Sequence, residues 1–432
     1  MISVWEKERP HLRFAPSEGK KSTDVLIIGG GAAGILCAYK LKQAGVDFLL
    51  LEATDVCGGI TKNTTAKITL THSLLYDKML RRFGEEKTRL YVEAQASAIK
   101  EYACLSKSIN CDFETRDSYV YSLQSKEKIK KEIAALNRIG IKAELSDARE
   151  LPFPVAGALR VREQAQFHLL KFLYGIAKEL PIHEHTKVLS LRPHKAITSH
   201  GEVTFRKLII ATHFPILNKH GGYFLKLYQH RSYVLALKNA LAIQGMYVDE
   251  SDTGLSFRPY GDLLLLGGGG HRTGKKGGCW QELETFAKKH YPKAEIVAKW
   301  AAQDCMTLDG IPYVGQYARS TPDVFVATGF NKWGMTNAMV ASNILSDLVK
   351  GRPNPYAAVF SPSRSMLRPQ LAVNIFSSVV GLLTPTAPRC PHLGCALKYN
   401  PAEHTWDCPC HGSRFTEKGE VIDNPATDDK AL

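Results

Sequence analysis

The sequence lacks an apolar run long enough to cross a membrane. Its 432 residues are 44% hydrophobic, with a mean hydropathy of -0.17, which is typical of globular proteins in water. The first 21 residues are charged and contain Pro10 and Pro16 instead of the apolar core of a secretory signal. We therefore expect no transmembrane segment and a cytoplasmic location.

The sequence also lacks a disulfide framework, an internal repeat and a concentrated basic tract. The net charge of +14 is spread along the chain, with only short groups such as 128–131. A solvated basic surface explains this better than nucleic-acid binding, and steering of an anionic substrate or an acidic redox partner is a further use. Six cysteines are scattered without regular spacing. They are Cys37, Cys57, Cys104, Cys111, Cys279 and Cys305.

What the N-terminal part does contain is a dinucleotide-binding pattern. The runs 24–28 and 46–51 predict buried strands, and 35–43 predicts a helix between them. Three glycines in the first turn allow a tight bend, close approach to a pyrophosphate and close helix packing. Glu52 follows the second strand, where an acid would bind ribose hydroxyls. The glycines are Gly29, Gly31 and Gly34.

Later segments favour FAD over NAD as the dinucleotide. A second glycine pair, Gly58 and Gly59, follows the ribose acid closely. Residues 323–330 predict another strand that runs into glycine, and a helix begins near 333–336. The N-terminus of that helix can face the flavin ring and stabilise negative charge on the reduced flavin.

Near the C-terminus, the segments 390–395 and 408–413 each combine cysteine with histidine. Two thiolates and two imidazoles suit a Rieske [2Fe-2S] centre or a tetrahedral zinc site. Zinc fingers usually pair like with like, whereas here each segment supplies one residue of each type. An iron–sulfur centre is therefore favoured, with zinc or an empty, degenerate site as alternatives. The four candidate ligands are Cys390, His392, Cys408 and His411.

The chain resembles the glycine/D-amino-acid oxidase (DAO) family of FAD-dependent oxidoreductases, fused to a Rieske domain as in a bacterial group of such proteins. The resemblance covers residues 24 to about 426. It implies an α/β fold with a Rossmann-like FAD-binding domain and a mixed-sheet substrate domain, followed by a small all-β Rieske module. The segments that carry the resemblance to the oxidase family are 24–52, 64–76, 208–213, 309–315 and 328–336.

The resemblance also implies site residues. The cysteines Cys395 and Cys410 could form a disulfide that ties the cluster loops together, and the hydroxyl of Ser413 could hydrogen-bond a cluster sulfur and raise the reduction potential. The expected FAD contacts are Gly29, Gly31, Ala32, Ala33, Gly34, Glu52, Gly59, Thr61, Val188, Ala211, Thr212, Gly329, Gly334, Met335 and Thr336.

The Rieske module looks truncated. Such modules usually place several strands of a base ahead of the first cluster loop, yet only 351–389 intervenes here, and 371–383 could be one helix. The loops could sit on a minimal scaffold, borrow support from the flavin domain or fail to assemble. The expected domains are an extension (1–22), the oxidoreductase (23–350; FAD part 23–80, 155–215 and 300–350; substrate part 81–154 and 216–299), a linker (351–389) and the Rieske module (390–432).

The substrate part predicts helices that cap a mixed sheet, which would wall a cavity over the flavin. The glycine-rich segment 267–274 is either a loop at the cavity mouth or the exit of a strand. Helical periodicity covers 87–110 and 124–138, and strand patterns cover 232–237, 245–248, 253–258 and 262–267.

Catalytic residues are harder to identify, because amine oxidation by flavin needs mainly a neutral amine, an aligned hydrogen and a dry pocket. Lys67 and His72 are candidates by analogy, since either could tune the flavin or take a proton. A structural role is favoured for Tyr76. Arg231 or Arg272 could bind a substrate carboxylate.

The sequence thus predicts an enzyme that oxidises an amine or amino acid by hydride transfer to FAD. Electrons would pass through the Rieske cluster to an external one-electron acceptor, a protein or a quinone. One alternative is an electron-transfer or redox-sensing protein without a small amine substrate. Another is an FAD oxidase with a non-functional Rieske remnant, which the short base favours and the intact ligand set opposes.

Overall fold

The structure, a computed structural model, describes residues 2–217, 220–385 and 388–429. Its first sheet has the order β16-β17-β10-β1-β2-β7, and β8 and β9 extend it from β10. Five strands run parallel, as expected of a dinucleotide-binding domain. The strands are β1 (Gly19–Ile28), β2 (Phe48–Leu51), β7 (Ile182–His183), β8 (Val188–Arg192), β9 (Lys195–Thr198), β10 (Gly201–Ile210), β16 (Tyr313–Gln316) and β17 (Val324–Thr328).

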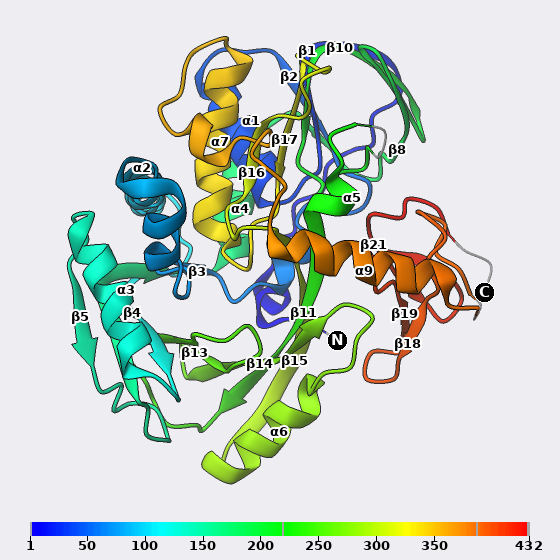
Figure 1. Ribbon diagram of the computed structural model, residues 1–432. Helices are drawn as coiled ribbons and strands as arrows, with labels where there is room; N and C mark the ends of the chain where they lie inside the picture. The colour runs from blue at the N-terminus through cyan, green and yellow to red at the C-terminus, as the bar shows by residue number, and fades with distance from the viewer. Residues whose placement is uncertain (1, 218–219, 386–387, 430–432) are drawn as a thin grey trace.

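Both faces of this sheet are covered. Val25 and Ile27 of β1 belong to the apolar cluster that includes α1, α4 and α7, whereas Leu26 and Ile28 join a second cluster on the other face. The strand is therefore apolar at successive positions. Figure 1 shows α1 and α7 packed together beside the sheet. The helices are α1 (Ala32–Gln43), α4 (Leu169–Ala177), α5 (Tyr223–Lys226) and α7 (Gly334–Val349), with 3-10 turns at Val4–Glu8 (η1) and Ile60–Asn63 (η2).

The second sheet is mixed, with the order β15-β11-β14-β13-β12-β4-β6-β3, and β5 pairs with β6. The four strand patterns and two helical patterns predicted in the substrate part are confirmed. Residues 267–270 lie within β14, so the strand-exit interpretation of the glycine-rich segment holds. The elements are β3 (Lys67–Ile68), α2 (Tyr76–Leu105), β4 (Glu114–Ser122), α3 (Lys126–Arg138), β5 (Ala143–Ser146), β6 (Gly157–Gln166), β11 (Leu227–Lys238), β12 (Met246–Asp249), β13 (Ser256–Tyr260), β14 (Leu263–Arg272), α6 (Cys279–His290) and β15 (Glu295–Thr307).

The C-terminal module is a four-stranded antiparallel sheet beside which α9 runs, as Figure 1 shows in orange and red. The predicted helix over 371–383 is confirmed as α9, and the described residues of 351–389 form no strand. The module's own apolar cluster holds seven buried residues, four of them cysteines. The elements are α8 (Ala357–Phe360), α9 (Pro369–Leu383), β18 (Lys398–Asn400), β19 (Thr405–Asp407), β20 (Arg414–Thr416) and β21 (Val421–Asp423).

Among the helices within these described ranges, none combines the length and apolarity needed to span a bilayer.

Candidate active site and metal centre

The turn between β1 and α1 fits a dinucleotide pyrophosphate. Gly29 adopts a φ of 110°, and a Cβ there would lie 2.6 Å from the Ala211 carbonyl oxygen. A Cβ on Gly34 would lie 1.9 Å from the carbonyl oxygen of Gly29. α1 begins at Ala32, so the N–H groups of its first turn lie beside the glycine turn. Glycine is therefore required at both positions, because a side chain would clash with neighbouring backbone and prevent the turn and the helix from packing closely against the strands.

Glu52 lies beside the same turn. Its Oε2 accepts the Gly30 N–H at 2.7 Å, and its Oε1 accepts the Thr54 N–H at 2.9 Å. Thr61 accepts the Ala32 N–H through Oγ1 at 3.2 Å. The other predicted FAD contacts lie at strand ends and helix starts: Ala33 in α1, Gly59 before η2, Val188 at the start of β8, Ala211 and Thr212 after β10, Gly329 after β17, and Gly334, Met335 and Thr336 in the first turn of α7. Their individual roles stay predictions.

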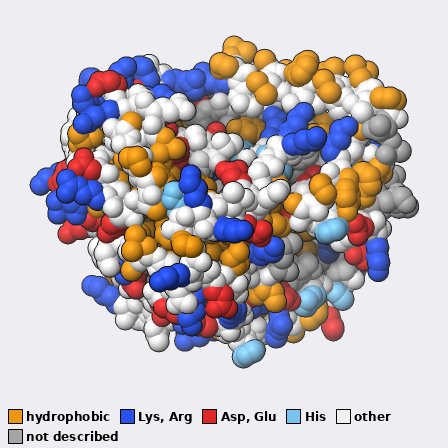
Figure 2. All heavy atoms as spheres, turned by 90° about the horizontal axis from the view of Figure 1, so that it is seen from below, with side chains coloured by type: hydrophobic (Ala, Val, Ile, Leu, Met, Phe, Trp, Pro, Cys, Tyr) orange, Lys and Arg blue, Asp and Glu red, His pale blue; other side chains and the backbone are white. Residues whose placement is uncertain are grey.

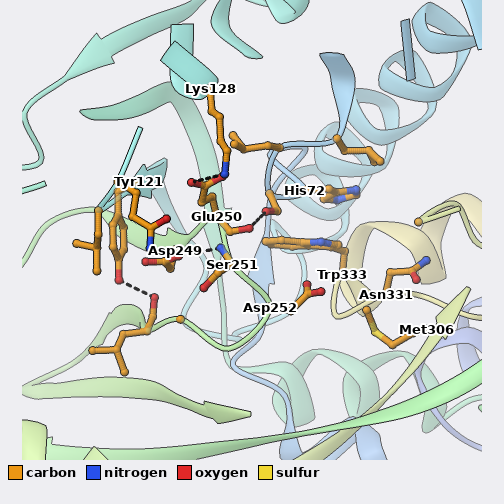
Figure 3. Close-up of a pocket in the computed structure, with 18 of the residues that line it drawn as sticks. His72, Tyr121, Lys128, Asp249, Glu250, Ser251, Asp252, Met306, Asn331 and Trp333 are labelled. Atoms are coloured by element: carbon orange, nitrogen blue, oxygen red, sulfur yellow. Dashed lines mark hydrogen bonds and ion pairs between the residues drawn. The ribbon is translucent and has the colours of Figure 1, made fainter. Parts of the chain in front are cut away.

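Two adjoining cavities lie at the start of α7. The larger has a volume of about 1050 Å³ and the smaller about 150 Å³. Trp333 lines both, and its ring stacks on the His72 ring with centroids 4.9 Å apart, as Figure 3 shows. The smaller cavity is also lined by Lys67, Gly334 and Met335. Trp333 therefore lies between a compartment beside predicted flavin contacts and a wider cavity.

Lys67 is suited to accept a proton. Its Nζ donates to the Tyr247 carbonyl oxygen at 3.3 Å. Burial, followed by the positive charge of Arg258, lowers the pKa of Lys67 to about 7. A lysine with this pKa is partly neutral at physiological pH, and the neutral amine is the form that accepts protons.

We expect Lys67→Met to slow reduction of the flavin by an amine substrate about 10²–10⁴-fold. In the unmodified protein the rate should rise as the pH increases through about 7, because Lys67 becomes neutral. Anaerobic stopped-flow absorbance of the flavin would measure both effects. Lys299→Met, at an exposed position of β15, is the control. A rise near neutral pH that persists in Lys67→Met would contradict this role.

Both ring nitrogens of His72 form hydrogen bonds. Nε2 lies 3.0 Å from the Thr69 carbonyl oxygen, which can only accept, so Nε2 carries the proton. Nδ1 then accepts the Tyr91 hydroxyl at 2.7 Å. Burial lowers the pKa of His72 to about 3. These contacts orient the imidazole against the ring of Trp333, and burial keeps the imidazole neutral. They favour Lys67 over His72 as the proton acceptor. Both catalytic assignments stay predictions.

Tyr76 fills the structural role expected of it. The side chain is fully buried, and its hydroxyl donates to the Leu70 carbonyl oxygen at 2.5 Å. Its backbone N–H donates to the carboxylate of Glu132 at 2.7 Å, at the start of α2.

The large cavity carries charges of both signs. Three of the acids, Asp249, Glu250 and Asp252, lie at the end of β12 and just after it, and Figure 3 shows this segment beside Trp333. Glu250 forms an ion pair with Lys128 at 3.1 Å. No motif marks these residues in the sequence, because they converge from separate elements. The acids are Asp249, Glu250, Asp252, Glu282 and Asp309, and the cations are Lys78, Arg82, Lys128 and Lys289.

The prediction that Arg231 or Arg272 binds a substrate carboxylate is wrong. Arg231 donates through Nε to Glu403 at 3.0 Å, and Arg272 donates to the Cys410 carbonyl oxygen at 3.3 Å. Neither guanidinium lines either cavity. Both hold the C-terminal module instead.

The four predicted cluster ligands converge at the tips of two loops. Cys390 and Cys408 are buried, and a hydrogen bond from the Cys408 thiol lowers the pKa of Cys390. The rings of His392 and His411 lie 5.0 Å apart. Burial lowers the pKa of His411 to about 3, so its imidazole is neutral at physiological pH. A neutral imidazole beside a second imidazole and two thiols fits the ligand set of a Rieske cluster.

The disulfide predicted between the cluster loops is confirmed, whereas the hydrogen bond from Ser413 to a cluster sulfur stays a prediction. Cys395 and Cys410 form a disulfide that joins the two loops. The Ser413 side chain hydrogen-bonds the Cys390 thiol, which lowers the pKa of that thiol, and the Ser413 oxygen accepts the Ala426 N–H at 3.0 Å. These contacts hold the two cluster loops together and position the ligand side chains.

The fold and these sites define a flavoprotein with an attached iron–sulfur module. The family described as FAD dependent oxidoreductase (DAO) matches residues 24–348, and the Rieske [2Fe-2S] domain matches residues 369–431. The chain belongs to the DAO family of FAD-dependent oxidoreductases and carries a C-terminal Rieske domain. The DAO domain binds FAD, and the Rieske domain binds a [2Fe-2S] cluster.

Relatives span most of the chain. The "Putative Rieske 2Fe-2S iron-sulfur protein YhfW" of Bacillus subtilis (strain 168) is 34% identical over 489 residues, covering 98% of this chain and 96% of the relative. That alignment exceeds the 432 residues of this chain, so the relative has segments absent here. The gamma-glutamylputrescine oxidoreductase of Escherichia coli (strain K12) is 24% identical, covering 76% and 84% of the two chains. Glycine oxidase from Geobacillus kaustophilus shares the fold, with a TM-score of 0.68, 18% identity and coverage of 80% and 99%.

Proposed function

We propose that this protein oxidises an amine or amino acid at its FAD and relays the electrons through its Rieske cluster to an external one-electron acceptor, a protein or a quinone. Bound FAD supplies two-electron chemistry and the cluster one-electron chemistry. The observation that carries the proposal is the burial of the second cluster loop, 408–413, against the flavin-containing part of the chain.

Glycines permit this burial. Gly412 adopts a φ of 89°, and a Cβ there would lie 2.2 Å from the Gln229 side chain. A Cβ on Gly274 would lie 2.6 Å from the backbone nitrogen of Pro409. Gln303 donates to the Gly412 carbonyl oxygen at 2.9 Å. The loop therefore packs into the substrate sheet with backbone contacts that larger residues would prevent.

The same region reaches the predicted FAD contacts. His213 follows Thr212, and its Nε2 lies 3.2 Å from Oε1 of Gln229, the residue that touches Gly412. Asn424 donates to the carbonyl oxygens of Thr212 and Phe214. A short chain of contacts thus joins the segment after β10 to the cluster loop, which supports electron transfer within one chain.

The cavity charges support an amine or amino-acid substrate. Asp249, Glu250 and Asp252 can attract an ammonium group, and the four cavity cations can attract a carboxylate. The names of the oxidoreductase relative and of glycine oxidase concern an amine and an amino acid, in keeping with this choice. A cavity of about 1050 Å³ beside the predicted flavin contacts favours a small-molecule substrate over a protein that only carries electrons.

We further infer a cytoplasmic location. Six of the ten cysteines belong neither to the disulfide nor to the predicted cluster ligands and are free thiols, and thiols persist mainly in reducing compartments.

Iron content and low-temperature EPR test the relay. Protein purified without oxygen is expected to contain two irons and one flavin per chain and to give a Rieske-type signal after reduction with dithionite. A screen of amines and amino acids should then find compounds that reduce the flavin and produce the same signal without dithionite. Flavin without iron would make the module a remnant. A reduced flavin beside a cluster that stays oxidised would exclude the relay.

A further inference from the structure

Helix α9 turns its small and polar side chains toward the protein and its apolar side chains toward solvent, the reverse of the usual arrangement. Its buried residues are Asn374 and Gly381. Asn374 donates to the Leu225 carbonyl oxygen at 3.0 Å and accepts a hydrogen bond from Arg272 at 3.0 Å. At 100° per residue, small and polar side chains share this protein-facing side. They are Gln370, Asn374, Ser377, Ser378 and Gly381.

The opposite side of α9 is apolar and exposed to solvent. Phe376 is 70% exposed and Leu383 is 76% exposed. Figure 2 shows a row of hydrophobic side chains along one edge of the molecule, where this helix lies. A contiguous exposed patch of this kind marks an interaction surface, unlike single apolar residues. The patch, here called the α9 ridge, comprises Val373, Ile375, Phe376, Val379, Val380, Leu382 and Leu383.

The charges in the segment that contains the ridge are of one sign. The sequence contains no aspartate or glutamate from residue 348 to residue 402, whereas it has six lysines and arginines there. Two of the six, Lys350 and Arg364, form ion pairs with Asp347 and Asp309, which leaves Arg352, Arg368, Arg389 and Lys398. An apolar helix face flanked by cations is the arrangement that binds anionic lipid surfaces, because the apolar side chains enter the boundary of the acyl chains and the cations attract head groups. The ridge lies at an edge of the molecule, where a flat surface can reach it (Figure 2).

We propose that α9 binds the surface of an anionic lipid bilayer, lying parallel to it with the α9 ridge immersed. The same helix backs the cluster loops, since a Cβ on Gly381 would lie 2.5 Å from the Cys410 sulfur. Binding would hold the cluster module within about one helix diameter, roughly 10–12 Å, of the lipid. Under the proposed function, an acceptor dissolved in the bilayer would then be close to the cluster, although binding itself does not rest on that function.

Flotation with lipid vesicles tests the proposal on the complete protein. We expect binding to vesicles that contain phosphatidylglycerol, weaker binding at high salt, and little binding to pure phosphatidylcholine. Phe376→Ser combined with Leu383→Ser should lower the partition coefficient about tenfold or more. Both positions are exposed, so folding and iron content should not change. The matched control is Leu189→Ser with Leu241→Ser, two exposed leucines distant in sequence from α9.

Two outcomes would overturn the proposal. Equal flotation of the unmodified and ridge-substituted proteins would mean that another surface binds lipid. Absence of flotation, with a concentration-dependent dimer in analytical ultracentrifugation that the ridge substitutions abolish, would make a second copy of this chain the occupant. Turnover with a water-soluble acceptor is measured in parallel, so that failure of vesicle binding is distinguished from failure of the relay.

Discussion

Cys408→Ala is expected to remove the cluster and to stop turnover with a one-electron acceptor while FAD stays bound. Cys408 is fully buried and supplies one of two thiolates, and apart from Cys390 and Cys408 the two cluster loops contain no free cysteine that could replace it. Losing even an indirect contact to a metal costs about 10–100-fold in activity, so loss of a ligand should exceed a hundredfold. Iron analysis, flavin absorbance and steady-state rates measure the three quantities.

Cys104→Ala, at an exposed free thiol, is the control for this experiment and should leave all three unchanged. Reduction of the flavin by substrate should remain in Cys408→Ala, because none of the predicted FAD contacts belongs to the cluster loops. Unchanged turnover with an artificial one-electron acceptor would show that electrons leave the flavin without passing the cluster.

Glu403→Gln is expected to loosen the C-terminal module from the rest of the protein. The Glu403 carboxylate accepts hydrogen bonds from Arg231 of β11, from Tyr233 at 3.0 Å and from Arg414 at 2.8 Å. The two arginine side chains and that of Glu403 are at most 6% exposed. Removing one member of a buried ion pair costs about 3–5 kcal/mol. We expect about 3 kcal/mol here, because Asp423 still lies near both arginines.

Lowering the pH should weaken the interaction of Glu403 with the two arginines, because the carboxylate becomes protonated. Burial opposes ionisation of Glu403, but the charges of Arg231 and Arg414 outweigh it, so its pKa in the folded protein lies below the ordinary 4.5. The stabilisation is fully present above that ordinary value and is lost as the pH falls through the lower, folded-state pKa. Urea unfolding monitored by cluster absorbance should show a shallower acid dependence in Glu403→Gln. Glu417→Gln, at an exposed position of the same module, should behave like the unmodified protein.

Features that depend on neighbouring residues could be predicted from the sequence, and features that depend on the meeting of distant segments could not. Gly29, Gly34 and Glu52 belong to one βαβ unit, and the strands form where the pattern indicates. The cluster ligands likewise lie in two short loops. The ion pair of Arg231 with Glu403 could not be predicted, because the two residues are 172 positions apart and no local pattern links them.

The exposure of α9 could not be predicted for a similar reason. Its apolar residues indicate a helix, but they would normally be assigned to the core side. The polar contacts of Asn374 with Leu225 and Arg272 reverse that orientation. Which side of a helix faces inward depends here on partners that are more than a hundred residues away.

The small core of the C-terminal module has a consequence for biosynthesis. A ribosome delivers the N-terminal segments first, so the surface formed by Gln229, Gly274 and Gln303 can fold before the loop 408–413 emerges. Because seven buried residues are too few to order the loops alone, the iron ligands should gather only on a finished oxidoreductase domain. Iron loading would then act as a checkpoint, and a chain whose substrate sheet is misfolded would receive no cluster.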